Sequence, residues 1–195
     1  MHRFSSSTGR FQPHAFNGSG QSNARFSPLL DAAGGVVPTL YAAKLLEGAL
    51  METVLHDVPF PSQGHIHDLE RDLQGDLHAS HIDVIEDLQL IDLTKIGLQR
   101  MGLRVSELFE TDADDYPRTR MWAQWLHTTV SQAQGLYWMS ARQPECPAIL
   151  LFADRMPEAA LRQGHTPPRH LREPAVLSNL LTLLGRLGCG VASNR

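Results

Sequence analysis

Three side chains in the first part of the sequence have the chemistry of a binding pocket for a phosphate-containing ligand. Arg25 lies in a polar segment rich in glycine and serine, and Tyr41 and Glu52 follow it among apolar residues. The guanidinium group of arginine is a planar, weakly hydrated fork that matches phosphate oxygens. An aromatic ring between one positive and one negative side chain therefore suggests a pocket for an anionic nucleotide.

Glu52 is the most informative of the three positions. The spacing of apolar residues predicts a helix over residues 42–56, and Glu52 then lies beside Ala49 and His56 at the margin of its buried face. A carboxylate at the margin of a core is costly unless it faces a polar cleft or has a partner. On spacing alone, the simpler interpretation is a rim glutamate paired with His56 four residues later.

The other candidates also have structural interpretations. Tyr41 ends a strand predicted over residues 36–41, where a core tyrosine is common, and Arg25 could pair with a surface acid. Ser140 closes a strand predicted over residues 136–139, and a serine at a strand end is usually a turn former. A GC-rich genome would also explain why arginine greatly outnumbers lysine. No single residue decides the function.

The composition bounds the class of protein. The chain has 195 residues, 42% of them hydrophobic, which suits one globular domain with a sizeable core. A net charge of -4 and a pI near 6.2 argue against direct nucleic-acid binding through a broad basic face. The apolar run 148–153 is far shorter than the roughly 20 residues that span a bilayer. Two cysteines, Cys146 and Cys189, fit a reducing cytoplasm.

The first 30 residues contain three arginines, six serines and no acid, a composition shared with organellar transit peptides. Glycine and proline interrupt its phenylalanines and break any amphipathic helix. We therefore interpret this segment as an ordered, loop-rich beginning of the domain.

The remaining pattern predicts a mixed α/β fold: one domain over residues 1–195, with a small, largely antiparallel sheet and flanking helices. Asp114 to Pro117 should open the clearest helix, with Trp122 and Trp125 in its apolar stripe and Gly135 as its terminator. Residues 62–87 are predicted to be a polar loop or insertion, and residues 155–174 a polar connection. Further predicted elements are strands at 88–93 and 148–153, a helix from Thr94 to about Gly102, and a last helix at 175–187.

Four histidines in the polar segment, His65, His67, His78 and His81, raise the alternative of a metal site. No predicted strand or metal-binding helix motif holds them in place, so a solvated or partner-facing loop without metal is favoured.

Short motifs in a fixed order resemble a known family. "ARFSPL", "LYAA", "MET" followed by "LHDVP", "LYWMSAR" and "AILLFADR" resemble the RES domain, named for an arginine, a glutamate and a serine. The resemblance also includes "HRFSS", "LQLIDLTKIGLQRMGL" and "YPRTRMWAQWLH", so it runs nearly from end to end. RES domains are the toxin halves of RES–Xre toxin–antitoxin pairs.

The resemblance implies a fold similar to ADP-ribosyltransferase toxins and an activity that consumes NAD, with inorganic phosphate or water as the acceptor. Arg25, Tyr41, Glu52 and Ser140 match the catalytic set, and Arg3 joins Arg25, Tyr41 and Ser140 in NAD binding. The implied partner is an Xre-type helix-turn-helix antitoxin that covers the pocket, and a homo-oligomer within that complex is left open.

The chemistry of NAD is compatible with these side chains. Arginine is a natural clamp for a pyrophosphate, and cleavage of the nicotinamide–ribose bond generates an oxocarbenium-like sugar that Glu52 would stabilise. Nicotinamide leaves as a neutral molecule, so no strong general acid is required. Two alternatives remain: transfer of ADP-ribose to a protein, and a non-enzymatic binding module in which Arg25, Tyr41 and Glu52 are structural.

Overall fold

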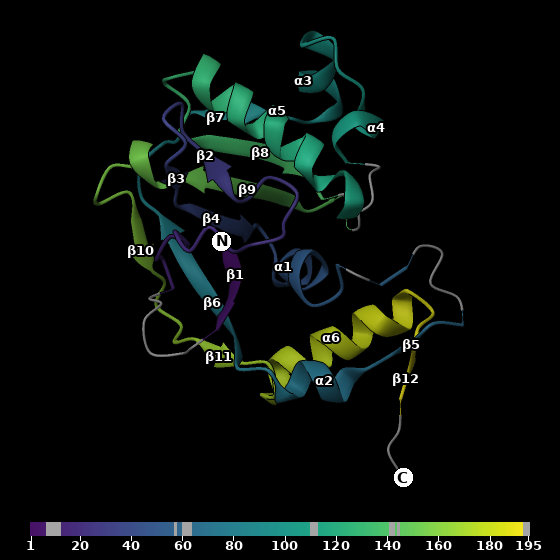
Figure 1. Ribbon diagram of the computed structural model, residues 1–195. Coiled ribbons are helices and arrows are strands. Elements are labelled where there is room, and N and C mark those ends of the chain that lie inside the picture. The colour runs from purple at the N-terminus through teal and green to yellow at the C-terminus, as the bar shows by residue number, and fades with distance from the viewer. Residues whose placement is uncertain are drawn as a thin grey trace.

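The computed structural model describes residues 1–6, 13–56, 58–59, 64–109, 113–140, 143 and 145–192. Strands and helices alternate irregularly along this chain (Figure 1). The main sheet is formed by β1 (His2–Ser6), β4 (Thr39–Ala43), β6 (Leu77–Val84), β7 (Leu90–Asp92), β8 (Gly135–Met139), β9 (Pro147–Phe152), β10 (Leu161–Gln163) and β11 (Arg169–His170). The two smaller sheets are formed by β2 (Leu29–Leu30), β3 (Val36–Val37), β5 (Ile66–His67) and β12 (Gly190–Val191). The helices are α1 (Leu46–Thr53), α2 (Leu69–Gln74), α3 (Lys95–Arg100), α4 (Val105–Leu108), α5 (Tyr116–Thr129) and α6 (Pro174–Arg186), with the 3-10 turns η1 (Ala113–Asp115) and η2 (Ala153–Arg155).

The main sheet has the strand order β10-β6-β1-β4-β9-β8-β7, with β11 also paired to β6. The β7–β8 pair is parallel, and the other pairs of this sheet are antiparallel. The predicted mixed α/β class with a largely antiparallel sheet is therefore confirmed. The sheet is larger than expected, because eight strands join it.

The hydrophobic core is divided by the two faces of the sheet, since successive side chains of a strand alternate between them. On β9, Leu150 packs with Leu136 and Trp138 of β8 against α5. Ile149 points to the other face, where it joins Leu40 and Ile82. A third cluster joins α6, α1 and β1 through residues such as Leu180, Leu50 and Phe4.

The range predicted to be a polar loop, 62–87, is wrong for the residues that the structure describes. It holds β5, α2 and β6, and β6 lies inside the main sheet between β1 and β10. The buried residues of β6 are Ala79, Ser80 and Ile82; His78 precedes them, and His81 lies between Ser80 and Ile82. Small and polar side chains fill this strand, so it lacks the alternation of large apolar residues that identifies a strand. The predicted connection 155–174 likewise contains β10 and β11 before it reaches α6.

Several local predictions can be compared directly. The Thr94 hydroxyl caps α3 by accepting from the Gly97 N–H at 3.3 Å, and Gly102 ends that segment with a φ of +73°. The predicted apolar stripe of α5 is wrong at Trp125, whose side chain is 51% exposed, because Ala123 and Leu126 occupy the buried face. The helix ends at Thr129, before Gly135, which was expected to stop it.

Among the described residues, no helix has the length and apolar character needed to cross a bilayer.

Candidate functional site

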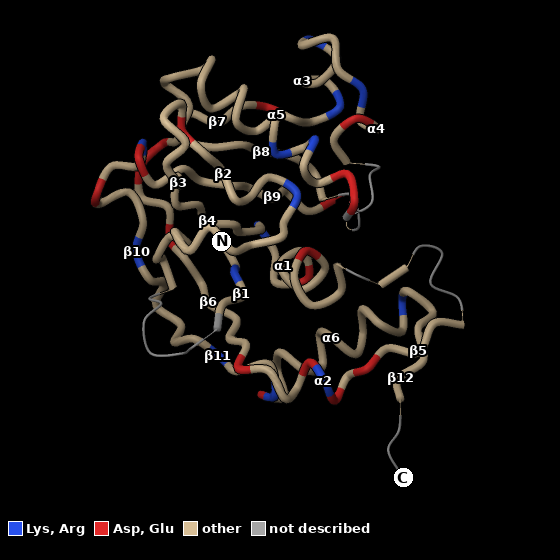
Figure 2. The backbone as a smooth tube through the Cα atoms, viewed as in Figure 1, with Lys and Arg blue, Asp and Glu red and all other residues tan. Residues whose placement is uncertain are grey.

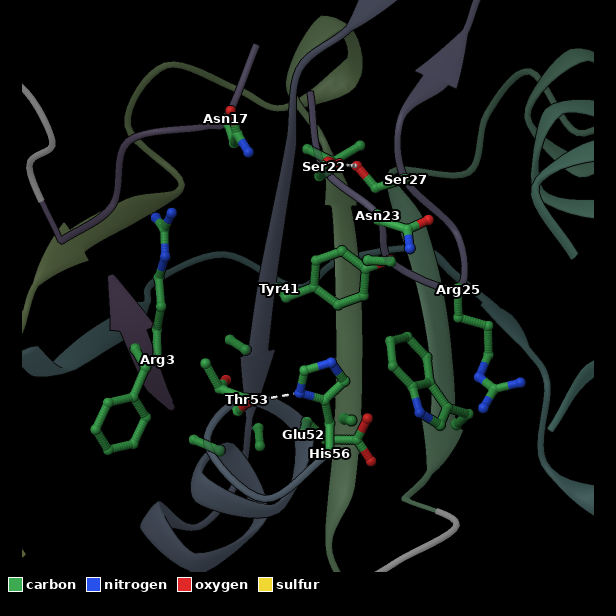
Figure 3. Close-up of a pocket in the computed structure, with 18 of the residues that line it drawn as sticks. Arg3, Asn17, Ser22, Asn23, Arg25, Ser27, Tyr41, Glu52, Thr53 and His56 are labelled. Carbon is green, nitrogen blue, oxygen red and sulfur yellow. Dashed lines mark hydrogen bonds between the residues drawn. The ribbon is translucent and has the colours of Figure 1, made fainter. Parts of the chain in front are cut away.

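A cavity of about 750 Å³ lies where α1 meets β4, β8 and the segment 22–27. Its floor contains Ala43 of β4 and Ala148 of β9, which are directly paired, and Ala148 is paired in turn with Trp138 of β8. Two alanines in neighbouring strands leave a space that larger side chains would fill. Figure 3 shows Tyr41 at the centre of this space, with Arg3 and Arg25 on opposite sides and Glu52 below.

Tyr41 joins the floor of the cavity to its wall. The phenolic oxygen of Tyr41 accepts the backbone N–H of Phe26 at 3.0 Å, and its ring meets Trp138 edge-on with centroids 6.2 Å apart. Burial raises the pKa of Tyr41 above its usual value, so the hydroxyl stays neutral at physiological pH. Tyr41 thus fixes the segment that carries Arg25.

We expect Tyr41→Phe to lower the free energy of unfolding by about 1–3 kcal/mol, because the Phe26 N–H would lose its acceptor in a buried place. Urea denaturation followed by circular dichroism measures this change. Tyr137→Phe is the matched control, because the Tyr137 hydroxyl donates to the sulfur of Met139 at 3.8 Å, which is a weak acceptor. Equal losses in the two variants would contradict the structural role of the Tyr41 hydroxyl.

Arg25 is fixed on the wall of the cavity. Its Nη1 donates to the Leu108 carbonyl at 2.6 Å, and its guanidinium lies 5.2 Å from the ring centroid of Tyr116 and 5.8 Å from that of Phe109. Contacts of this kind hold an arginine through electrostatic attraction to the ring faces. The charge of Arg25 is therefore placed beside the cavity by groups from distant parts of the chain.

Glu52 and Ser140 are brought together, although 88 positions separate them. The Ser140 hydroxyl donates to Oε1 of Glu52, and Ser140 Oγ accepts the Gln143 N–H at 3.2 Å. Ser140 is 1% exposed and does not line the cavity, whereas Glu52 does. Ser140 therefore contacts the carboxylate rather than the open space. His56, on the same rim, hydrogen bonds through Nδ1 to the Thr53 carbonyl at 2.7 Å.

Arg3 lines the end of the cavity away from Arg25 (Figure 3). Its Nη1 donates to the carbonyl oxygens of Pro13, at 3.2 Å, and Ala15. Burial lowers the pKa of Arg3 to about 10, so the group is still a cation at neutral pH. Figure 2 shows one basic position on β1, which is Arg3, and acidic positions on α1, so positive and negative side chains come from different elements around the cavity.

The structure adds aromatic residues that the sequence did not single out. Trp138, Phe109 and Tyr116 all line the cavity. Trp138 could have been found, because it precedes Ser140 by two residues in an extended chain and therefore points to the same side. Phe109 and Tyr116 reach the cavity only through the packing of α4 and α5, for which no local signal exists.

The four histidines considered for metal binding lie on β5, β6 and the turn before β5, and none of them lines this cavity. His67 pairs with Asp72 at 2.6 Å, and His81 lies 3.5 Å from Asp83. The described part of the chain contains no cluster of three or more His, Cys, Asp or Glu side chains that could hold a metal ion.

Similarity to known proteins agrees with the architecture. The model of the RES domain matches residues 2–172. The crystal structure of the M. tuberculosis MbcT–MbcA toxin–antitoxin complex contains a chain with a similar fold, at a TM-score of 0.64 and 20% sequence identity. The match covers 93% of this chain and 87% of that chain. No curated protein sequence matches the chain.

Proposed function

This chain belongs to the RES domain family, and we propose that it is the toxin of a toxin–antitoxin pair and acts by degrading NAD. The proposed reaction cleaves the bond between nicotinamide and ribose. The observation that carries the proposal is the convergence of Arg25, Tyr41 and Glu52, from three separate segments, on one cavity of about 750 Å³. This volume is within the usual range for sites that enclose a small molecule.

Arg25 is proposed to bind the pyrophosphate of NAD. A guanidinium pairs with phosphate oxygens through charge-assisted hydrogen bonds, which are stronger than neutral ones. Arg3 adds a second positive charge at the other end of the cavity, while it also holds the segment 13–15. Tyr41 and Trp138 offer aromatic surface to a planar base.

Glu52 is proposed to act on the sugar. When the bond from ribose C1′ to nicotinamide breaks, its electron pair stays on the nicotinamide nitrogen and neutralises the pyridinium ring. The positive charge moves to C1′ and the ring oxygen, where a carboxylate stabilises it. Water or inorganic phosphate then forms a bond to C1′, and water also loses a proton. Ser140 contributes by holding the Glu52 carboxylate through its hydroxyl.

The proposed partner is an antitoxin with an Xre-type helix-turn-helix. It is supported by family membership and by the similar fold of a chain in the MbcT–MbcA toxin–antitoxin complex. We propose that the antitoxin covers the cavity and carries the DNA-binding function, because the net charge of -4 does not favour nucleic-acid binding by this chain.

Induced expression in a bacterial host tests this function. The wild-type chain should lower the cellular NAD pool before growth stops, and Glu52→Gln at the same protein level should leave both unchanged. Enzymatic cycling assays on cell extracts measure the NAD pool over time. Growth arrest with a constant NAD pool would contradict NAD degradation. It would favour the alternative in which the chain transfers ADP-ribose to a protein.

A further inference from the structure

The first turns of α5 make contacts to the segment that carries Arg25. Thr119 has no exposed surface, and its hydroxyl donates to the backbone carbonyl of Arg25 across 94 positions of sequence. The same oxygen lies 3.0 Å from the Tyr116 carbonyl, one helical turn earlier. A hydroxyl has a single proton, and the contact to Arg25 is the shorter of the two.

The next residue of α5 extends this contact. Arg120 donates through Nε to the Ala24 carbonyl at 3.1 Å, and through Nη2 to the side-chain oxygen of Asn23. The ring of Tyr116 lies 5.2 Å from the Arg25 guanidinium. These α5 residues are spaced by three and four positions, so they lie on one face of the helix.

The segment itself is a tight turn. The N–H of Ala24 donates to the Ser27 carbonyl at 3.1 Å, and the Ser27 N–H lies 3.4 Å from the Ala24 carbonyl. Arg25 and Phe26 therefore occupy the tip of the turn. A turn with few internal bonds needs external contacts to fix the direction of its side chains. Helix α5 supplies such contacts to three successive residues of this segment, Asn23, Ala24 and Arg25.

We propose that Thr119 and Arg120 are positioning residues, which hold the turn so that the Arg25 guanidinium points along the wall of the cavity. This inference rests on the proposed NAD-degrading function, because it assigns the two residues to the binding of its substrate. They act through the backbone of Arg25 and Ala24 and do not touch the substrate.

The kinetic signature follows from the role of Arg25. A group that binds the pyrophosphate acts equally on the ground state and the transition state, so its displacement raises KM and leaves kcat nearly unchanged. A displacement of about 1 Å can cost up to roughly 100-fold in efficiency. A purely structural defect instead reduces the fraction of active protein, which lowers the apparent kcat at constant KM.

Steady-state kinetics with NAD on purified variants test the inference. Thr119→Val removes the hydroxyl at nearly constant volume, and we expect its KM for NAD to rise about tenfold with kcat within about threefold of wild type. Thr119→Ser restores the hydroxyl and should restore KM. Arg120→Met, at a half-buried position, should also raise KM, whereas Arg118→Met on the exposed side of the same helix should not.

Each outcome decides the inference. A Thr119→Val enzyme with normal KM, or with lowered kcat at normal KM, overturns it while the proposed function stands. If Thr119→Val does not fold, Arg120→Met compared with Arg118→Met decides by the same criterion. A folded wild-type protein that leaves NAD intact overturns the proposed function and this inference together.

Discussion

Glu52→Gln should reduce the kcat for NAD cleavage by about 10²–10³-fold, with little change in KM or in thermal stability. Glutamine has nearly the same shape as glutamate, and its amide oxygen can still accept the Ser140 hydroxyl. The negative charge beside the developing oxocarbenium ion is lost, and this charge is of use only in the transition state. Steady-state kinetics with NAD and a thermal melt of each protein measure the two effects.

Glu47→Gln is the matched control, because Glu47 lies on the same helix but does not line the cavity. It should retain wild-type kcat. If Glu52→Gln retained kcat within about threefold of wild type, Glu52 would not be the residue that stabilises the sugar cation. Equal losses in both variants would indicate a general effect of the charge of α1.

Arg25→Met should raise the KM for NAD by about 10- to 100-fold, because a charge-assisted hydrogen bond is worth about 1.5–3 kcal/mol and each 1.4 kcal/mol is a factor of ten. Methionine is unbranched and can pack its sulfur against the rings of Phe109 and Tyr116 in place of the guanidinium, so the fold should be preserved. The KM of Arg25→Lys should fall between those of wild type and Arg25→Met, since lysine keeps the charge but loses the planar fork. Initial rates over a wide range of NAD concentrations measure this order.

Arg104→Met controls for the loss of one positive charge, because the Arg104 side chain is 83% exposed and pairs with Glu107 rather than the cavity. Its KM should equal that of wild type. Should Arg25→Met bind NAD as well as wild type, the pyrophosphate would have to lie against another part of the cavity.

The sequence predicted those parts of the fold that depend on local signals. Apolar runs identified β8 and β9, and the hydroxyl of Thr94 identified the start of α3. β6 was missed because its buried residues, Ala79, Ser80 and Ile82, are mostly small or polar, and the strand is recognised only by its pairing with β1 and β10. No rule based on periodicity within one segment can detect such a strand.

The candidate site could be predicted in its residue types but not in its contacts. Arg3, Arg25, Tyr41 and Glu52 line one cavity, and their roles toward NAD stay predictions. Ser140 reaches the site through Glu52, and this contact joins residues 88 positions apart. Such long-range pairs depend on how the helices pack on the sheet, which a single sequence does not reveal.

The contacts of α5 illustrate the same limit. Thr119 is an ordinary helix residue in the sequence, yet its hydroxyl contacts the turn that carries Arg25. This contact can be recognised only from the packing of α5 against the segment 22–27.

Proton and phosphorus NMR of NAD incubated with the purified chain, free of any antitoxin, tests the central claim most directly. Free nicotinamide is expected in the proton spectrum, in amounts that far exceed the protein. If inorganic phosphate is the acceptor, the phosphorus spectrum also gains a new phosphorylated ADP-ribose signal when phosphate is added. Nicotinamide release without phosphate would identify water as the acceptor, or self-modification if the yield stops at one equivalent. Intact NAD in every sample of folded protein would contradict the account.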